Sequence, residues 1–471
     1  MYSNPLEKRY ASRQMTEIFT DEYKYRIWRR CWIALAESEK ELGIHISSEQ
    51  IKEMKDNIDN IDLSVMEKFE KELRHDLMAG VHCFAEKCPL AAPIIHLGAT
   101  SCDITDNSEL IQIYNALKII RGRLLAVIKD LYSFANRHKK IVCLGYTHFQ
   151  PAQPTTIGKR ACIWLSDLIL HLEEINRLID GFRLKGVKGA TGTQDSYLKL
   201  FNGDRKKVSE LDKNFCKKLG FDDSYSIVGQ TYPRIFDCKV LDVLKNICIS
   251  AHKFASDFRL MQHLKMMDEP FEKKQIGSSA MAYKKNPMRS ERICSLARFV
   301  MAQSIAADNT ASQQWFERTL DDSAGRRIYI SQSFMAVDAI LIIFSNIISG
   351  AIVHEEVIKS LLNNELPFMS TETIIMESVK KGGNRQKLHE IIRKHSVLIA
   401  EKVKQGKKNK LLEALAKDPE IPFKLEELEE IINKTAFHGI SIEQTIDFLK
   451  YVKKIINDNR DKIIDPCDLK V

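Results

Sequence analysis

The chain has 471 residues, of which 44% are hydrophobic, and this apolar content is enough for large buried cores in two to four domains. Glycine (20) and proline (12) fall below their usual shares of about 7% and 5%, which favours long elements with few turns, and therefore helices. The formal net charge is only +8, which argues against a dedicated nucleic-acid binder and fits a small anionic substrate.

The eleven cysteines are scattered and include no C-x-x-C pair, so they predict reduced core thiols and no zinc site. Reduced thiols, together with an N-terminus that lacks the apolar core of a signal peptide, favour a cytoplasmic location. The most apolar stretch, residues 339–353, is shorter than the roughly 20 residues that span a bilayer, so we expect a buried helix there.

Apolar residues recur at alternating spacings of three and four over residues 110–131, 165–179 and 240–261. This spacing predicts long helices that pack against one another along one side. Residues 328–348 are apolar nearly all round, as expected for a helix in the middle of a bundle. We therefore expect an all-α fold built around long helices, and because one chain rarely covers both faces of such helices, we expect an oligomer.

Three segments follow from this pattern. Shorter helices are expected in residues 1–103, the long helices in residues 104–356, and shorter, more charged helices in residues 357–471. A lysine-rich run at 402–410 is expected to be a solvated loop. No glycine-serine linker separates the segments, so we expect them to pack tightly.

Residues 72–82 contain two histidines. On a continuous helix, His75 would share a face with His82, and Glu72 would lie one turn back to orient the His75 ring. A pair of metal ligands would need a spacing of four rather than seven residues, so no metal site is predicted. The alternative is an exposed polar face.

Residues 146–156 read YTHFQPAQPTT. Pro151 and Pro154 favour an extended backbone, and Thr155 or Thr156 can cap the helix that begins at Ile157. His148 then lies on a stiffened loop before a long helix, which suits a proton donor, although a purely structural histidine is the commoner case.

Residues 272–292 form a lysine-rich loop around Ser278 and Ser279. Nearby cations such as Lys284 would make a serine hydroxyl more acidic or bind an anion. The alternative is an exposed basic loop. The residues alone do not decide which of the two serines would act.

Residues 314–327 combine candidate helix caps with arginines. Asp321, Asp322 or Ser323 can cap a helix, and Arg318, Arg326 and Arg327 flank its start. Free backbone N–H groups and arginines together bind phosphate, with ordinary capping as the alternative. Arg318 and Arg327 cannot share one helix face at this spacing, so we expect a turn between them.

Taken in order, these motifs resemble a known family. Residues 277–288 (GSSAMAYKKNPM) look like the signature loop of the fumarase/aspartase superfamily, whose members are helical homotetramers that eliminate or add across fumarate. Segments 74–76, 100–107, 148–154, 229–232, 286–292 and 315–323 resemble the animal-type adenylosuccinate lyase family within it. The similarity thins after about residue 400. Two positions depart from the family pattern: Ala282 stands where proline is usual, and Gly325 where asparagine is expected.

The resemblance implies β-elimination of fumarate from adenylosuccinate, giving AMP, and from succinylaminoimidazole carboxamide ribotide. Ser278 would be the general base and His148 the general acid, with His75 and Lys284 close to the reacting group. The residues that would bind substrate are Arg9, Tyr10, Arg74, Asp76, Thr100, Ser101, Gln230, Asn286, Arg292, Arg318, Ser323 and Arg327. The family builds each site from three subunits of a homotetramer and needs no cofactor or metal.

The chemistry of the residues agrees with this interpretation, since the carbanion needs nearby cations and the leaving nitrogen needs a proton. The glycine-rich stretch 186–192 lacks dinucleotide-loop spacing, so no nucleotide cofactor is expected. Three alternatives remain: a sister enzyme such as argininosuccinate lyase, a non-catalytic helical scaffold, and an RNA-binding protein. The last is disfavoured because the basic residues cluster in loops instead of along one stripe.

Overall fold

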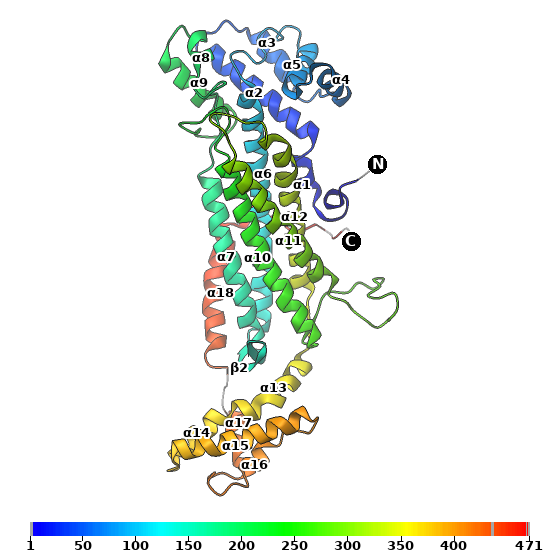
Figure 1. Cartoon of the computed structure of the whole chain (residues 1–471), viewed down its shortest axis with the longest axis vertical. Coiled ribbons are helices and arrows are strands. Elements are labelled where there is room, and N and C mark those ends of the chain that lie inside the picture. Colours follow the sequence, from blue (N-terminus) through cyan, green and yellow to red (C-terminus); the bar gives the residue numbers. More distant parts are fainter. Residues whose placement is uncertain (1–2, 435–437, 468, 470–471) are drawn as a thin grey trace.

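The computed structural model describes residues 3–434, 438–467 and 469. It is an elongated helical molecule whose long helices run side by side along its axis (Figure 1). These bundle helices are α6 (Ser101–His138), α7 (Ile157–Asp180), α10 (Ile235–His263), α11 (Met288–Ser312) and α12 (Asp322–Gly350). Every segment with the three-four spacing lies in one of them, so the all-α prediction is confirmed.

The bundle is held together by the apolar faces that the spacing predicted. Leu110, Leu117, Leu124 and Leu131 of α6 have no exposed surface. The most enclosed element is α12: it is long and apolar enough to cross a membrane, but 83% of its most apolar window is buried inside the chain. Its Phe344 stacks on Phe254 of α10 with ring centroids 3.8 Å apart. The stretch expected to be a buried helix, residues 339–353, is therefore helical up to Gly350. Ile352–Val353 then forms a short strand.

The N-terminal segment covers one end of the bundle, drawn in blue in Figure 1. Its elements are a π-helical turn η1 (Leu6–Tyr10), α1 (Arg13–Ile18), α2 (Asp21–Glu41), α3 (Ser48–Asp56), α4 (Leu63–Leu73) and α5 (Asp76–Lys87). Two helices from later in the chain, α8 (Asp195–Leu200) and α9 (Arg205–Lys218), lie at the same end, where α9 contacts α2. The segment boundary expected at residue 103 falls within the first turn of α6.

The opposite end carries a smaller helical unit with its own core. Its helices are α13 (Glu355–Met369), α14 (Thr371–Lys380), α15 (Arg385–Lys404), α16 (Leu411–Leu415) and α17 (Leu425–Lys434). The lysine-rich run begins inside α15 and continues as a loop only after Lys404.

One helix departs from the expected C-terminal segment of residues 357–471. α18 (Ser441–Asp458) contacts α6 and α7, and its Leu449 and Val452 belong to the core of the bundle. A short 3-10 turn, η2 (Arg460–Lys462), follows it. The apolar face of α18 is thus covered by the bundle instead of by its neighbours in sequence.

Two short antiparallel strand pairs complete the fold: β1 (Val142–Thr147) with β2 (Gln150–Thr156), and β3 (Met267–Asp268) with β4 (Ile352–Val353). Thr156 ends β2 and caps α7, since its Oγ1 accepts from the backbone N–H of Lys159 at 3.1 Å. This confirms the predicted cap. The β1–β2 pair contacts α13, so it lies at the end of the bundle away from the N-terminal segment.

Candidate active site

A cavity of about 700 Å³ opens where the N-terminal segment meets the bundle. Its walls come from α2, the α4–α5 junction, the start of α6, the loop before α10 and the start of α12. Eight of the predicted site residues line it: Arg74, His75, Asp76, Ser101, Gln230, Arg318, Ser323 and Arg327. Segments far apart in sequence therefore meet in one polar cavity.

The expected continuous helix over residues 72–82 is wrong. α4 ends before Arg74, which adopts a left-handed conformation (φ 54°), and His75 becomes the N-cap of α5. The Nδ1 atom of His75 accepts from the backbone N–H of Met78 at 3.4 Å, and its Nε2 lies 3.5 Å from Ser101 Oγ. The His75 ring is therefore oriented by the first turn of α5 and by Ser101, and not by Glu72.

The start of α12 is not a simple capped helix. Asp321 occupies the N-cap position but makes no side-chain cap bond. Asp322 is 1% exposed, and its Oδ2 accepts from Arg234 Nε at 2.7 Å. Because its carboxylate is turned toward a buried arginine, the capping alternative does not account for this motif.

Two arginines face the cavity beside the start of α12. They come from different elements, as their spacing in the sequence predicted. Arg318 lies in the preceding loop and bonds Asp322 Oδ2 at 3.3 Å. Arg327 lies within α12 and bonds Asp76 Oδ2 at 2.7 Å, and its side chain remains 59% exposed. Exposed ion pairs contribute little stability, so a phosphate dianion can replace Asp76 as the partner of Arg327 at small cost.

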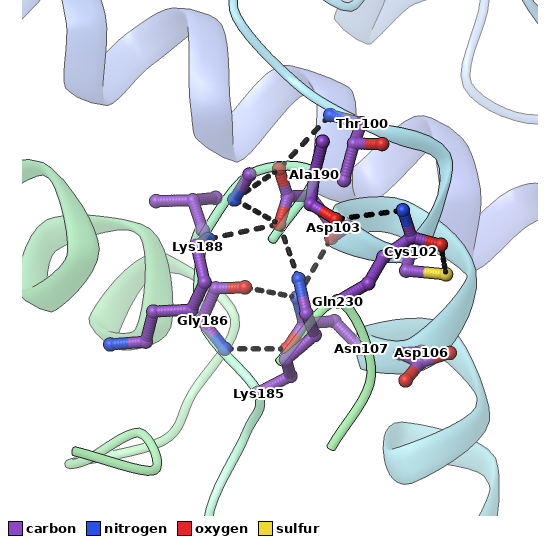
Figure 2. Close-up of polar contacts among 12 residues, drawn as sticks. Thr100, Cys102, Asp103, Asp106, Asn107, Lys185, Gly186, Lys188, Ala190 and Gln230 are labelled. Atoms are coloured by element: carbon purple, nitrogen blue, oxygen red, sulfur yellow. Dashed lines mark hydrogen bonds and ion pairs between the residues drawn. The ribbon is translucent and has the colours of Figure 1, made fainter. Parts of the chain in front are cut away.

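The carboxylate of Asp103, on the first turn of α6, has no exposed surface (Figure 2). Burial alone would raise the pKa of this carboxyl, but the Lys185 ammonium and backbone donors outweigh it and hold the pKa below its ordinary value. The donors to it are Lys185 Nζ, Tyr197 Oη and the backbone N–H groups of Thr100, Lys188 and Gly189. Asp103 therefore fixes the loop of residues 185–190 against the start of α6.

That loop in turn holds Gln230 at the cavity wall. The Nε2 of Gln230 donates to Ala190 O at 2.9 Å, and Cys102 Sγ donates to Gln230 Oε1 at 3.6 Å (Figure 2). Sequence reasoning missed Asp103 and Lys185, because a buried pair 82 positions apart leaves no periodic signal. Burial raises the pKa of the Cys102 thiol to about 12, so this thiol stays protonated and is no nucleophile.

The lysine-rich loop between α10 and α11 projects from the side of the bundle (Figure 1). Its last residues are helical, since α11 begins at Met288. Ser278 Oγ accepts from the backbone N–H groups of Ala280 at 3.3 Å and Met281 at 3.1 Å. Asn286 Nδ2 donates to Gly277 O at 2.7 Å and closes the loop. Two N–H dipoles therefore point at the Ser278 hydroxyl, which favours it over Ser279 as the atom that bears charge.

The N-terminal turn lies against the start of α11. The Arg292 guanidinium lies over the Tyr10 ring, 5.6 Å from its centroid, and Arg9 lies 5.9 Å from the same ring. Arg292 also borders a second cavity of about 540 Å³ beneath the lysine-rich loop. These three predicted substrate-binding residues thus form one group.

One chain does not bring all the predicted residues together. Ser101 begins α6 and His148 lies beyond its other end, and 38 residues of helix rise about 57 Å. Gln230 precedes α10 and Ser278 follows it, and its 29 residues rise about 43 Å. His148 and Ser278 therefore each lie far from the cavity along the bundle, so a single chain does not form a site that contains all three.

No group of three or more histidine, cysteine, aspartate or glutamate side chains suited to a metal occurs within the described residues. His82 stacks on Phe69 with centroids 5.4 Å apart. Ten of the eleven cysteines are buried, which confirms the expectation of core cysteines.

A family model described as "Lyase" matches residues 7–302, and one described as "Adenylosuccinate lyase C-terminus" matches residues 367–448. The chain is 47% identical to the adenylosuccinate lyase of Schistosoma mansoni over 451 residues, which cover 95% of this chain and 94% of that protein. The chain belongs to the adenylosuccinate lyase family. The Saccharomyces cerevisiae adenylosuccinate lyase is 46% identical over 461 residues, covering 97% and 95% of the two chains. Adenylosuccinate lyase similarity thus extends well past residue 400, farther than the motifs alone suggested.

The fold agrees with this assignment. The fumarate lyase of Mesorhizobium sp. BNC1 superposes with a TM-score of 0.81 at 21% identity, over 96% of this chain and 99% of that one. The 3-carboxy-cis,cis-muconate lactonizing enzyme of Pseudomonas putida gives 0.83 at 19% identity, with the same coverage. At these identities the likeness shows the helical fold alone, which the adenylosuccinate lyase family shares with these enzymes.

Proposed function

We propose that the chain catalyses β-elimination of fumarate from adenylosuccinate, giving AMP, and from succinylaminoimidazole carboxamide ribotide in purine biosynthesis. Family membership supports the reaction, and the polar cavity supports the substrate class. In the cavity Arg318, Arg327 and the first turn of α12 suit a phosphate. Ser101 and Gln230 of the same cavity offer donors to a dicarboxylate.

The elimination needs a base, an acid and a place for negative charge. Ser278 removes the C–H proton next to a succinyl carboxylate, and the N–H groups of Ala280 and Met281 stabilise the serine oxygen when it is charged. Charge that develops on the succinyl carboxylate is stabilised by cations, for which Lys284 of the same loop is suited. His148 donates a proton to the departing purine nitrogen.

We further infer a cytoplasmic homotetramer whose sites are each shared by three subunits. The distances of about 57 Å and 43 Å along α6 and α10 support sharing. Apolar side chains exposed on the bundle helices support an interface there. They include Ile163 (50% exposed), Leu170 (57%), Ile249 (48%), Leu260 (42%) and Ile305 (61%). The free buried thiols support a reducing location.

A complementation experiment tests the shared site. Ser278→Ala and His148→Gln are each expected to be inactive, because each lacks one proton-transfer group. When the two variants are mixed, dissociated and reassembled, some sites receive an intact serine from one chain and an intact histidine from another, so activity should return. If the reassembled mixture stays inactive while wild type treated in the same way recovers, base and acid do not come from different chains.

A substrate comparison tests the phosphate end of the cavity. Adenylosuccinate should be consumed at least about 100-fold more efficiently than the nucleoside that lacks its phosphate, because charge-assisted contacts to phosphate are lost. Equal efficiency would contradict the assignment of Arg318 and Arg327. Release of fumarate from argininosuccinate in preference to adenylosuccinate would instead favour a sister lyase.

A further inference from the structure

The C-terminal tail, residues 463–467, lies against the middle of α6, close to the N-terminal segment. Figure 1 shows the first and last described segments of the chain on the same side of the bundle. The backbone N–H of Ile464 donates to Gly122 O at 3.2 Å. A Cβ atom at Gly122 would lie 2.5 Å from Ile464 Cγ1 and 2.8 Å from Lys462 O. The tail can therefore approach α6 this closely only because residue 122 has no side chain.

The next residue on α6, Arg123, links this tail to the rest of the chain. It is 2% exposed, and its Nη1 donates to the carbonyl oxygens of Ile464, at 3.4 Å, and of Asp465. Its Nη2 donates to Gln14 Oε1 at 3.1 Å, and its Nε donates to Asp338 Oδ1 at 3.3 Å. One buried guanidinium thus joins the tail, the N-terminal segment and the central helix α12.

Asp338 links Arg123 to the N-terminal turn. It has no exposed surface, and its Oδ2 accepts from the backbone N–H of Ser12 at 2.7 Å. Ser12 is 2% exposed, and its hydroxyl caps α1 by accepting from Met15 N–H at 3.2 Å. It stands two positions after Tyr10. The Asp338 carboxylate therefore anchors the backbone that carries Arg9 and Tyr10. The Arg123 guanidinium offsets the free-energy cost of burying this carboxylate.

We propose that the tail is a positioning element for the nucleotide end of the active site. It supplies the carbonyl oxygens that hold Arg123, and Arg123 with Asp338 and Gln14 then fixes the segment that bears Arg9 and Tyr10. This inference rests on the proposed function, and it takes Arg9 and Tyr10, which the family resemblance makes substrate-binding residues, to contact the nucleotide phosphate. The tail itself touches no reacting group, so its loss should weaken nucleotide binding and leave proton transfer largely intact.

The substitution Gly122→Ala tests this in the full-length chain. Alanine is favoured over glycine inside a helix by up to about 1 kcal/mol, so any loss reports displacement of the tail and not weakening of α6. Turnover of adenylosuccinate would be measured together with the inhibition constants of AMP and fumarate. We expect the AMP constant to rise about tenfold, equivalent to one charge-assisted contact. The fumarate constant and kcat should change by less than about twofold, and the tetramer should persist.

Two further variants make the result decisive. Lys129→Ala removes only the exposed ion pair between Lys129 and Asp465, and should leave the AMP constant unchanged. Asp338→Asn perturbs the same anchor from α12, and should raise the AMP constant selectively even if Gly122→Ala fails to fold.

The outcomes separate this inference from the proposed function. An unchanged AMP constant in folded Gly122→Ala, or an equal rise for AMP and fumarate, overturns the positioning role. If Gly122→Ala does not fold, an unchanged AMP constant in Asp338→Asn overturns it. If wild type releases no fumarate from adenylosuccinate, the proposed function has failed instead, and the same assay shows this before any variant is compared.

Discussion

Glu39 on α2 is a buried carboxyl whose removal should stabilise the protein. It has no exposed surface, and neither side-chain oxygen has a hydrogen-bond partner within the described part of the chain. Burial raises the pKa of this carboxyl to about 9, so at pH 7 Glu39 is protonated in the folded chain and ionised in the unfolded chain. Methionine has a similar volume without polar atoms, so Glu39→Met should be more stable than wild type.

The size of the effect follows from linkage between ionisation and folding. Because the folded-state pKa of about 9 lies above the ordinary value of 4.5, stability is complete below pH 4.5 and falls as the pH rises through the interval between them. The fall is about 1.4 kcal/mol per pH unit, which gives about 3 kcal/mol at pH 7. Glu39→Met should recover about this amount of the free energy of unfolding.

Urea unfolding of both proteins between pH 5 and pH 8 measures this difference. The advantage of Glu39→Met should grow with pH by about 1.4 kcal/mol per unit. Glu39→Gln is the control of equal shape that does not titrate, and its difference from Glu39→Met should be independent of pH. An advantage of Glu39→Met over wild type that does not change with pH would refute the reasoning, because ionisation of the buried carboxyl would not be its source.

Three further predictions concern the site. Arg318→Met and Arg327→Met should each weaken AMP binding by about 10–100-fold, measured by titration calorimetry, and an unchanged affinity would contradict a phosphate site there. Gly277→Ala should lower kcat by at least about tenfold, because its Cβ would lie 2.1 Å from Lys284 O and displace the loop that holds Ser278; an unchanged kcat in steady-state assays would show that the loop tolerates this shift. Lys185→Met leaves the Asp103 carboxylate buried without its cation, so denaturant unfolding should show a loss of about 3–5 kcal/mol; a loss below about 1 kcal/mol would mean that the backbone donors suffice.

The long helices could be predicted from the sequence because their packing is a repeated pattern. The seam of α6 and the cap at Thr156 are local features that neighbouring residues specify. The break between α4 and α5 could not be predicted, because Arg74 adopts a left-handed conformation without the glycine or asparagine that signals one. The return of α18 to the bundle was missed for a different reason, since an amphipathic face does not say which partner covers it.

The site was predictable in its residues more than in its arrangement. Motifs around His75, Ser278 and Arg318 identified candidate groups, but the motifs alone did not show that His75 and Arg318 line one cavity while Ser278 lies far from it along the bundle. Helix length decides this, and the predicted extent of α6 already separates its start from His148. The role of Asp103 could not be predicted, because it depends on the loop of residues 185–190, which is far away in sequence and contacts Asp103 only in the folded chain.

Direct observation of the reaction tests the central claim. Purified protein mixed with adenylosuccinate should release fumarate and AMP, followed by ultraviolet absorbance and checked by chromatography. Ser278→Ala should lose several orders of magnitude in rate as a folded oligomer, and the matched variant Ser279→Ala should keep most of its activity, because the N–H groups of Ala280 and Met281 point at Ser278. A folded wild-type protein that leaves adenylosuccinate unchanged, or a Ser278→Ala protein with full activity, would contradict the account.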